Sequence, residues 1–198
     1  MDAKLSSHAA PRSHAESLRA RPIAAAAMAV AAGGAATILG AWFFQYVLGY
    51  MPCPLCLEQR YAFYFGIPLA VMVVLGANVG ASRKVLLLAL FAIMAGMIWN
   101  TGLSGFHAGV EWKWWPGPRD CSGPLDSLSA GSLLRDLQSI HIARCDEAAW
   151  RFLGISLAGY DVLISAALAA IAGWGLLAGL KQTRPADEPA AQRPQRTR

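Results

Sequence analysis

The chain has 198 residues and carries 17 Lys and Arg against 12 Asp and Glu, a formal net charge of +5. Four long runs contain no charge at all, which excludes an ordinary soluble globular protein; they are residues 22–57, 61–82, 85–110 and 162–180. No basic stripe interleaved with aromatic residues lies outside these runs, so the sequence gives nucleic-acid binding no support.

We predict an all-α integral membrane protein, because a bilayer core needs about 20 apolar residues per helix and each run approaches or exceeds that length. The four predicted transmembrane helices span about residues 23–50, 61–79, 85–106 and 162–180. They form one domain over residues 23–180, with a short first outer loop and a long second one at 107–161. The polar segments 1–22 and 181–198 are predicted to be disordered.

Basic residues gather at both termini and in the turn between the second and third spans. The positive-inside rule therefore predicts that both termini are cytoplasmic. The first apolar run extends to Leu57. It is longer than the h-region of roughly 7–15 residues in a signal peptide, so we expect this segment to be a retained span.

All four cysteines fall on the outer side of this topology; they are Cys53, Cys56, Cys121 and Cys145. An even number confined to one face indicates an oxidising compartment. Three interpretations follow: two structural disulfides, a zinc site completed by His107 or His141, or a dithiol relay that passes electrons into the membrane.

The spacing of the cysteines separates these interpretations. A structural disulfide suits Cys121 and Cys145, because closing a loop of that size stabilises by roughly 3–4 kcal/mol. The ring between Cys53 and Cys56 closes almost no chain, and such tight pairs more often do redox chemistry. Zinc sites usually join two close-spaced ligand pairs, which the second cysteine pair does not provide. The relay is therefore favoured.

The residues around Cys53 and Cys56 support this interpretation. The sequence PCPLC at 52–56 leads directly into the second predicted helix. Cys56 then lies in its first turn, where free N–H groups and the helix dipole favour a thiolate. Arg60 follows on the same face. It is either an interfacial Arg that reaches the lipid head groups or a donor to a ligand oxygen, and the neighbouring cysteines favour the second role.

Three stretches resemble the DsbB family of disulfide bond formation proteins: FFQYV at 43–47, PCPLCLEQR at 52–60 and CDEAAWRFLG at 145–154. The resemblance covers roughly residues 35–180, including the order of the spans. Pro54, inside the C-x-x-C motif, occupies a variable position of the family pattern, and we expect it to stiffen the turn.

The resemblance implies an enzyme of the bacterial inner membrane that re-oxidises a soluble periplasmic DsbA-like thiol oxidase. It implies that the electrons pass to a membrane quinone, either ubiquinone or menaquinone. DsbA-type oxidants have potentials of about −120 mV, so the final acceptor must be more oxidising still. On matching positions, Arg60 contacts the quinone and His107 falls near a family His that borders the quinone pocket.

The resemblance also assigns the cysteines to two redox disulfides, Cys53–Cys56 and Cys121–Cys145. Cys56 lies next to the quinone, and Cys53 exchanges with the loop pair. Cys121 forms the mixed disulfide with the partner protein, and Cys145 passes oxidation on from the C-x-x-C pair. No metal is expected at these positions.

Two features of the long loop remain open at this point. Leu and Ile recur at helical spacing across residues 125–140, which predicts a short amphipathic helix on the outer leaflet or packed on the bundle. The aromatic cluster of residues 112–115 is an interfacial belt or part of a docking surface.

The alternatives to a quinone-dependent thiol oxidase are a non-catalytic scaffold with two structural disulfides and an enzyme similar to vitamin K epoxide reductase. In that second family the membrane-facing C-x-x-C follows the loop cysteines, whereas here it precedes them.

Overall fold

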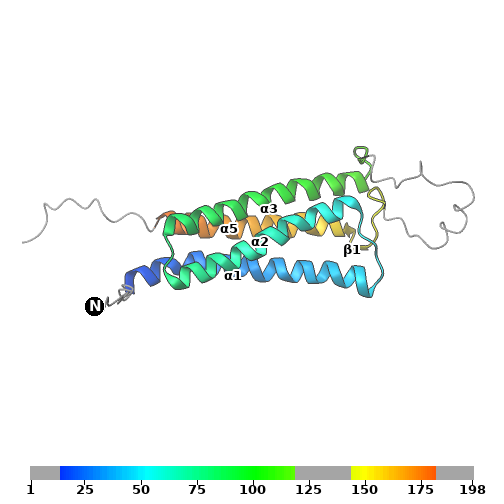
Figure 1. Cartoon of the computed structure of the whole chain (residues 1–198). Coiled ribbons are helices and arrows are strands. Elements are labelled where there is room, and N and C mark those ends of the chain that lie inside the picture. The colour runs from blue at the N-terminus through cyan, green and yellow to red at the C-terminus, as the bar shows by residue number, and fades with distance from the viewer. Residues whose placement is uncertain (1–13, 119–143, 182–198) are drawn as a thin grey trace, which may run out of the picture.

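Four long helices form an up-and-down bundle with a small β-hairpin at one end (Figure 1). The computed structural model describes residues 14–118 and 144–181. In chain order, the elements are α1 (His14–Trp42), the π-helix η1 (Phe43–Val47), α2 (Pro54–Val79), α3 (Arg83–Glu111), β1 (Arg151–Phe152), β2 (Ile155–Ser156) and α5 (Leu157–Lys181). Cys121 and the amphipathic helix predicted in the long loop lie outside the described residues.

Each of the four helices α1, α2, α3 and α5 contains a segment long and apolar enough to cross a membrane. Large apolar side chains on their outward faces are more than half exposed, among them Leu39, Phe65, Leu88 and Leu177. Exposed apolar surface on all four helices suits contact with lipid rather than with water. The predicted fold class, an all-α bundle of four transmembrane helices, is confirmed.

The helices are longer than the spans that we predicted from the uncharged runs. α1 begins at His14, so residues 14–22, which we predicted to be disordered, are helical. α3 continues to Glu111 and α5 already begins at Leu157. An absence of charge marks the thickness of the hydrocarbon core, whereas a helix that satisfies its own backbone hydrogen bonds continues beyond it.

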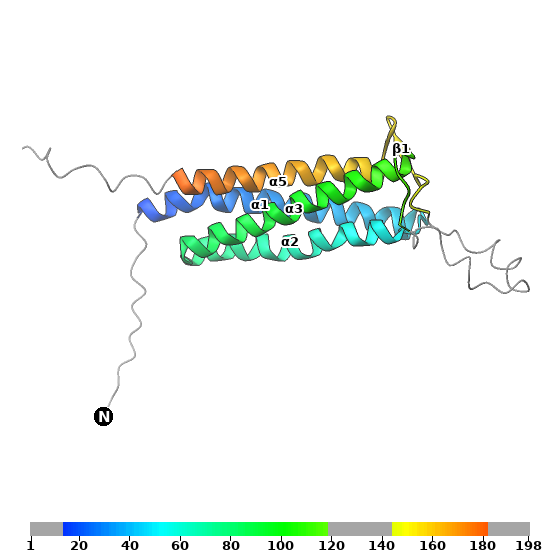
Figure 2. The same ribbon diagram turned by 90° about the horizontal axis from the view of Figure 1, so that it is seen from above.

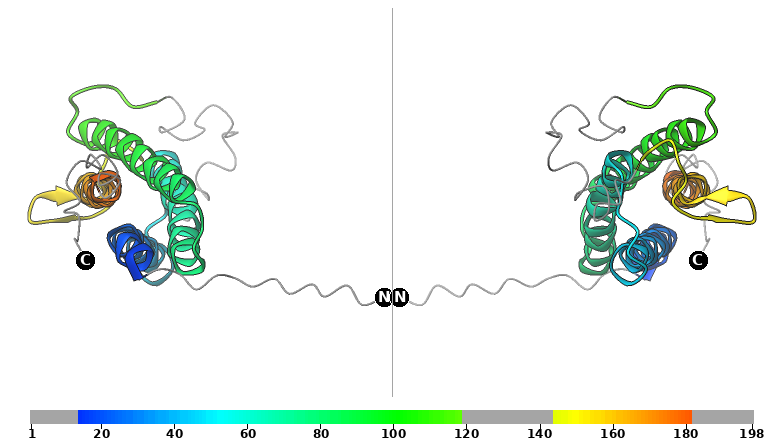
Figure 3. Two further views of the ribbon diagram at one scale, coloured as in Figure 1. Left: turned by 90° about the vertical axis from the view of Figure 1, so that its left-hand side faces the viewer. Right: turned by 90° about the vertical axis from the view of Figure 1, so that its right-hand side faces the viewer.

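The helices pack in a ring in which α1 and α3 each contact both α2 and α5 (Figure 3). Small residues let neighbouring backbones approach closely, as is common between helices in membranes. Gly33 of α1 faces Leu168 of α5, and Gly175 of α5 faces Ala26 of α1. The resulting apolar core runs along the bundle and includes Val30, Phe63, Leu90 and Ala172.

The segments that carry the predicted chemistry meet at one end of the bundle (Figure 2). α1 ends there in η1, and residues 48–53 lead from η1 into α2. At the same end α3 stops, and the antiparallel hairpin, with Arg151 opposite Ser156, leads into α5. A second, smaller core cluster packs here; its buried members are Cys53, Leu55, Val110 and Cys145. Packing therefore holds together cysteines from the two loops at this end of the bundle.

The contact at Gly175 yields a prediction for bundle stability. A Cβ atom at this position would lie 2.4 Å from Ala26 Cβ, and an Ala side chain cannot rotate away. We expect Gly175→Ala to destabilise the bundle by about 1–3 kcal/mol through overpacking. Gly96→Ala is the matched control, because a Cβ atom at Gly96 meets nothing within 4 Å. Thermal unfolding in detergent, followed by circular dichroism, measures both; equal midpoints for the two variants would contradict the close packing of α1 on α5.

Candidate active site

The first two cysteines form the N-terminal cap of α2. Pro54 occupies the first turn of the helix, and Cys53 is its extended N-cap residue. The Cys56 backbone N–H donates to Cys53 Sγ at 3.2 Å, and the two sulfur atoms lie 2.7 Å apart. Both are free cysteines in this structure. Proline lacks an N–H group, so it costs the helix start no hydrogen bond, while the Cys56 N–H is satisfied by the Cys53 sulfur.

The environment of Cys53 favours its thiolate. A hydrogen bond from the Cys56 thiol lowers the pKa of Cys53 from 9.0 to about 5, against the opposing effect of burial. His107 adds to the lowering of this pKa through a hydrogen bond. A thiolate is the nucleophile in thiol–disulfide exchange, so Cys53 is prepared to react at neutral pH.

His107 of α3 is buried next to the cysteine pair and is only 2% exposed. Its Nδ1 atom lies 2.9 Å from Gln59 Nε2, and its Nε2 atom lies 3.6 Å from Cys53 Sγ. Because the amide nitrogen of Gln59 donates to Nδ1, the ring carries its proton on Nε2 and donates to the sulfur. Glu111, one turn further along α3, lies 3.9 Å from the same Nε2 atom.

Cys145 from the second loop lies beside this pair. It is fully buried and is already part of a disulfide. Cys145 Sγ, Cys53 Sγ and a ring nitrogen of His107 lie within 4.8 Å of one another. Three such groups can hold a metal, but a sulfur engaged in a disulfide is not the thiolate that zinc requires. The arrangement instead sets a dithiol next to a disulfide with which it can exchange.

Ion pairs hold Asp146, the residue after Cys145, next to the end of α3. Lys113 Nζ lies 2.7 Å from Asp146 Oδ2, and Arg144 Nε lies 3.1 Å from Asp146 Oδ1. The hydrogen bond from Lys113, followed by that from Arg144, lowers the pKa of Asp146. Exposed ion pairs contribute little to stability. Their effect here is positional, because they tie the residue after Cys145 to the end of α3.

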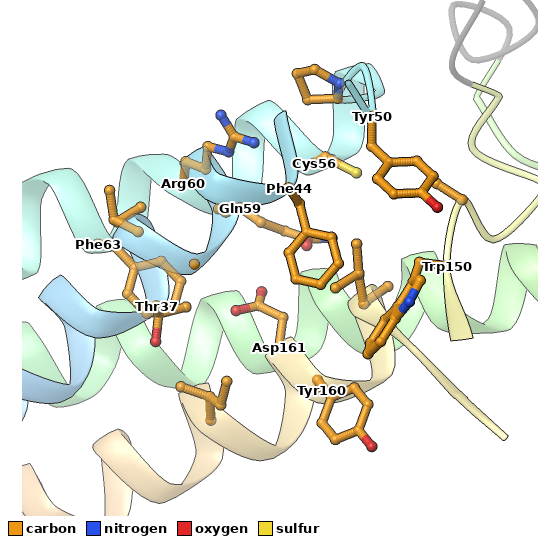
Figure 4. A pocket seen from close by; sticks show the side chains of 18 of the residues that line it. Thr37, Phe44, Tyr50, Cys56, Gln59, Arg60, Phe63, Trp150, Tyr160 and Asp161 are labelled. Atoms are coloured by element: carbon orange, nitrogen blue, oxygen red, sulfur yellow. The ribbon is translucent and has the colours of Figure 1, made fainter. Parts of the chain in front are cut away.

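A cavity of about 590 Å³ lies on the other side of the cysteine pair, between α1, α2 and α5 (Figure 4). Its lining is largely apolar and aromatic, and it includes Cys56 and Arg60 from α2 and Asp161 from α5. Cys53 and His107 are absent from the described lining residues. The two cysteines of the motif therefore face different surroundings: Cys53 faces the loop disulfide, and Cys56 faces the cavity.

The walls of the cavity combine rings from distant parts of the chain. Phe44 of η1 lies 5.0 Å from Trp150, measured between ring centroids, and Trp150 stacks on Phe152 at 5.8 Å. Arg60 Nη1 donates to Gln45 Oε1 at 2.6 Å, which positions the guanidinium group at the cavity edge. The π-helix is what brings Gln45 and Phe44 to this point, and such bulges are frequent at functional sites.

The structure thus brings Cys53, Cys56 and Cys145 together, and it sets Arg60 against the cavity. His107 contacts Cys53 instead of lining the cavity. Sequence reasoning did not single out four polar groups of the site, which are Gln45, Gln59, Glu111 and Asp161. Two of these had a detectable signal: Gln59 precedes Arg60 in the motif, and Glu111 follows His107 by one helical turn.

Comparison with known proteins identifies what the chain is similar to. A family model described as Disulfide bond formation protein DsbB matches residues 23–175. A Disulfide bond formation protein B from Xanthomonas axonopodis pv. citri is 34% identical over 155 residues, which cover 72% of this chain and 81% of the relative. Its namesake from Azoarcus sp. is 30% identical over 154 residues, which cover 74% and 88%. No solved structure gives a significant match.

The lowered pKa of Cys53 predicts a specific pH dependence. With the Cys53–Cys56 pair reduced, we expect the thiolate to persist at neutral pH and to be lost as the pH falls through about 5. Cys56→Ala removes the main hydrogen bond, so the midpoint should rise toward 9.0. The ultraviolet absorbance of the thiolate, corrected with the spectrum of Cys53→Ser, measures the midpoint. A wild-type midpoint at the ordinary value would contradict this assignment.

Proposed function

The chain belongs to the DsbB family of disulfide bond formation proteins, and we propose that it is a quinone-dependent membrane thiol oxidase. Its soluble substrate would be a DsbA-like periplasmic thiol oxidase, and its electron acceptor a membrane quinone, either ubiquinone or menaquinone. The observation that carries the proposal is the row of sulfur atoms: Cys145 lies within 4.8 Å of Cys53, which lies 2.7 Å from Cys56 at the cavity.

In the proposed sequence of exchanges, each disulfide bond that breaks is replaced by a new one. One thiolate of the partner attacks the sulfur of Cys121 and releases Cys145. The second thiol of the partner then displaces Cys121, and the partner leaves as a disulfide. Cys145 then attacks Cys53 of the Cys53–Cys56 disulfide and releases Cys56 as a thiolate. Cys121 attacks Cys145 in turn, which restores the loop disulfide and leaves Cys53 and Cys56 as a dithiol. That dithiol gives up two electrons and two protons at the cavity and becomes a disulfide again.

The residues of the cavity fit a quinone. Its volume of about 590 Å³ lies within the usual range for small-molecule sites. The aromatic wall around Phe44 and Trp150 suits a flat ring and an apolar tail. Arg60 would donate hydrogen bonds to a quinone oxygen, and Cys56 would present its sulfur to the ring. A bound quinone would supply a two-electron acceptor that also takes up two protons.

His107 has a different proposed role, directed at the cysteines. Because it donates to Cys53 and is backed by Gln59 and Glu111, it would stabilise negative charge on that sulfur during exchange. Its influence on a bound quinone would be transmitted through the cysteine pair, since it does not line the cavity among the described residues.

We further propose that the cysteine end of the bundle faces the periplasm and that both termini are cytoplasmic, in a bacterial inner membrane. Support comes from the turn between α2 and α3, which lies at the end of the bundle away from the cysteines (Figure 1). Arg83 and Lys84 follow this turn directly as the first residues of α3, as the positive-inside rule requires of a cytoplasmic helix end.

The alternatives explain the site less well. A scaffold with two structural disulfides does not account for the free cysteine pair between a loop disulfide and a cavity. An enzyme similar to vitamin K epoxide reductase would carry its membrane-facing C-x-x-C after the loop cysteines, the reverse of the order here.

An anaerobic reaction tests the function directly. Purified protein is mixed with a reduced DsbA-like protein and a ubiquinone analogue, and quinone absorbance is followed together with the thiols of the partner. We expect one quinone to be consumed per partner dithiol oxidised. Cys53→Ser should abolish turnover, whereas Glu58→Gln, an exposed change at the same end of α2, should retain it. Partner oxidation without loss of quinone would refute quinone dependence.

The exchange geometry can be tested without a quinone. In Cys56→Ser, Cys53 lacks its usual partner and lies within 4.8 Å of Cys145 Sγ. We expect Cys53 to attack the loop disulfide, form a Cys53–Cys145 bond and release Cys121 as a thiol. Peptide mapping without reduction detects this bond. Cys53→Ser is the matched control, because Cys56 faces the cavity and should form no link to Cys145; the reverse pattern would reject the assigned order of transfer.

A further inference from the structure

Asp161 lies in the second turn of α5, where it lines the cavity from the side opposite α2 (Figure 4). The fourth span that we predicted, residues 162–180, begins just after Asp161, but α5 begins at Leu157, four residues before it. Asp161 is therefore one turn inside a membrane helix. An ionisable residue at such a place is costly and commonly marks a functional site.

Three buried polar side chains hold one edge of this carboxyl group. Asn100 Nδ2 of α3 donates to Asp161 Oδ2 at 3.0 Å, and the hydroxyl group of Ser104 contacts the same oxygen. Ser165 of α5 accepts from Asn100 at 2.9 Å and lies 3.5 Å from Asp161 Oδ1. Asn100, Ser104 and Ser165 are each at most 1% exposed.

The two carboxyl oxygens are therefore not equivalent. Oδ2 receives two close polar contacts from α3, whereas Oδ1 has only the long contact with Ser165 among the described residues. Asp161 as a whole is partly exposed, although its three partners are buried. Because Asp161 lines the cavity and Oδ1 has the fewer contacts, we expect Oδ1 to be the oxygen that meets a ligand there.

Asp161 is also the only carboxyl group among the described lining residues of the cavity. The other ionisable groups there are Tyr50, Cys56, Arg60 and Tyr160. Carboxyl groups of Asp and Glu are common general acids in enzymes. Apart from Cys56, which loses its proton as part of the redox step, Asp161 is thus the side chain suited to transfer a proton inside the cavity.

We propose that Asp161 is a catalytic residue of the quinone site, which binds one quinone oxygen through its carboxyl group and delivers a proton to that oxygen. This inference rests on the proposed function. When the Cys53–Cys56 dithiol becomes a disulfide, it releases two electrons and two protons, and the hydroquinone product contains both. Asp161 gives its own proton to the oxygen on its side and is reprotonated by one of the two thiol protons. The other thiol proton goes to the second quinone oxygen, so Asp161 is unchanged over the cycle.

The competing role for Asp161 is purely structural. In that case its hydrogen bonds would serve only to hold α5 against α3, as polar side chains do in many membrane bundles. Asp161→Asn separates the two roles, because Asn has the same shape and still accepts from Asn100 and Ser104 but cannot act as an acid at this position. A structural residue tolerates this change, whereas a proton donor does not.

The experiment uses the full-length protein with its Cys53–Cys56 pair reduced and a short-tailed ubiquinone analogue. Tryptophan fluorescence quenching measures quinone affinity, and rapid mixing measures the rate at which the dithiol is oxidised. For Asp161→Asn we expect quinone affinity within about threefold of wild type but oxidation about 100-fold slower, the usual scale for loss of a general acid. Asp161→Glu should recover part of the rate.

Infrared difference spectroscopy gives a readout that does not depend on turnover. Binding of the oxidised analogue to wild type should perturb a carboxyl C=O band, and this signal should be missing from Asp161→Asn. Glu58→Gln, which removes an exposed carboxyl group at the same end of the bundle, should keep both the signal and the rate.

The possible results distinguish a failure of the proposed function from a failure of the role of Asp161. A wild-type dithiol that the quinone fails to oxidise would overturn the proposed function and the role of Asp161 with it. Normal oxidation of wild type together with an equal rate in Asp161→Asn would overturn the role of Asp161 alone. If the Asp161→Asn variant does not fold, the infrared measurement on wild type still tests the inference. A carboxyl band of wild type that quinone binding leaves unchanged would overturn it.

Discussion

The N-terminal cap of α2 determines where the reactive groups of this protein lie. Pro54 starts the helix without requiring a hydrogen bond for its own nitrogen, and Cys53 accepts from the Cys56 N–H as the cap residue. Cys53 is then buried beside Cys145, and Cys56 lines the cavity. If the helix began one residue earlier or later, both sulfur atoms would rotate by about 100°, because an α-helix has 3.6 residues per turn. Contact with Cys145 or with the cavity would then be lost.

Polar groups surround this cap at two separate places, the loop side and the cavity side of the cysteine pair. On the loop side, the donors to Cys53 are the Cys56 thiol and His107, and His107 is oriented by Gln59. On the cavity side, Arg60 is the cation, and the carboxyl group of Asp161 is held by uncharged partners. The cysteine pair is the boundary between the two, since Cys53 is buried in the loop-side cluster and Cys56 lines the cavity. A chain with this division can exchange disulfides with proteins on one side and meet a lipid-soluble ligand on the other.

Much of this arrangement could be predicted from local sequence. Uncharged runs indicated the four spans, and the position of Cys56 and Arg60 in the first turns of a helix indicated their shared face. The parts that could not be predicted depend on pairing across the bundle. Asn100 and Asp161 are 61 positions apart, and a single Asn or Ser in an apolar helix has no local pattern that announces its partner. The contact of His107 with Cys53 likewise joins residues 54 positions apart, so no local pattern announced it.

The second loop does more than carry a cysteine to the site. Cys145 and Trp150 lie on one short segment; the first is buried beside Cys53 and the second forms a wall of the cavity against Phe44. The segment is fixed at one end by the ion pairs of Asp146 and at the other by the hairpin that leads into α5. A displacement that carries Cys145 away from Cys53 therefore also pulls on the aromatic wall. In the proposed cycle, the segment that carries Cys145 would thus connect exchange with the soluble partner to the quinone site.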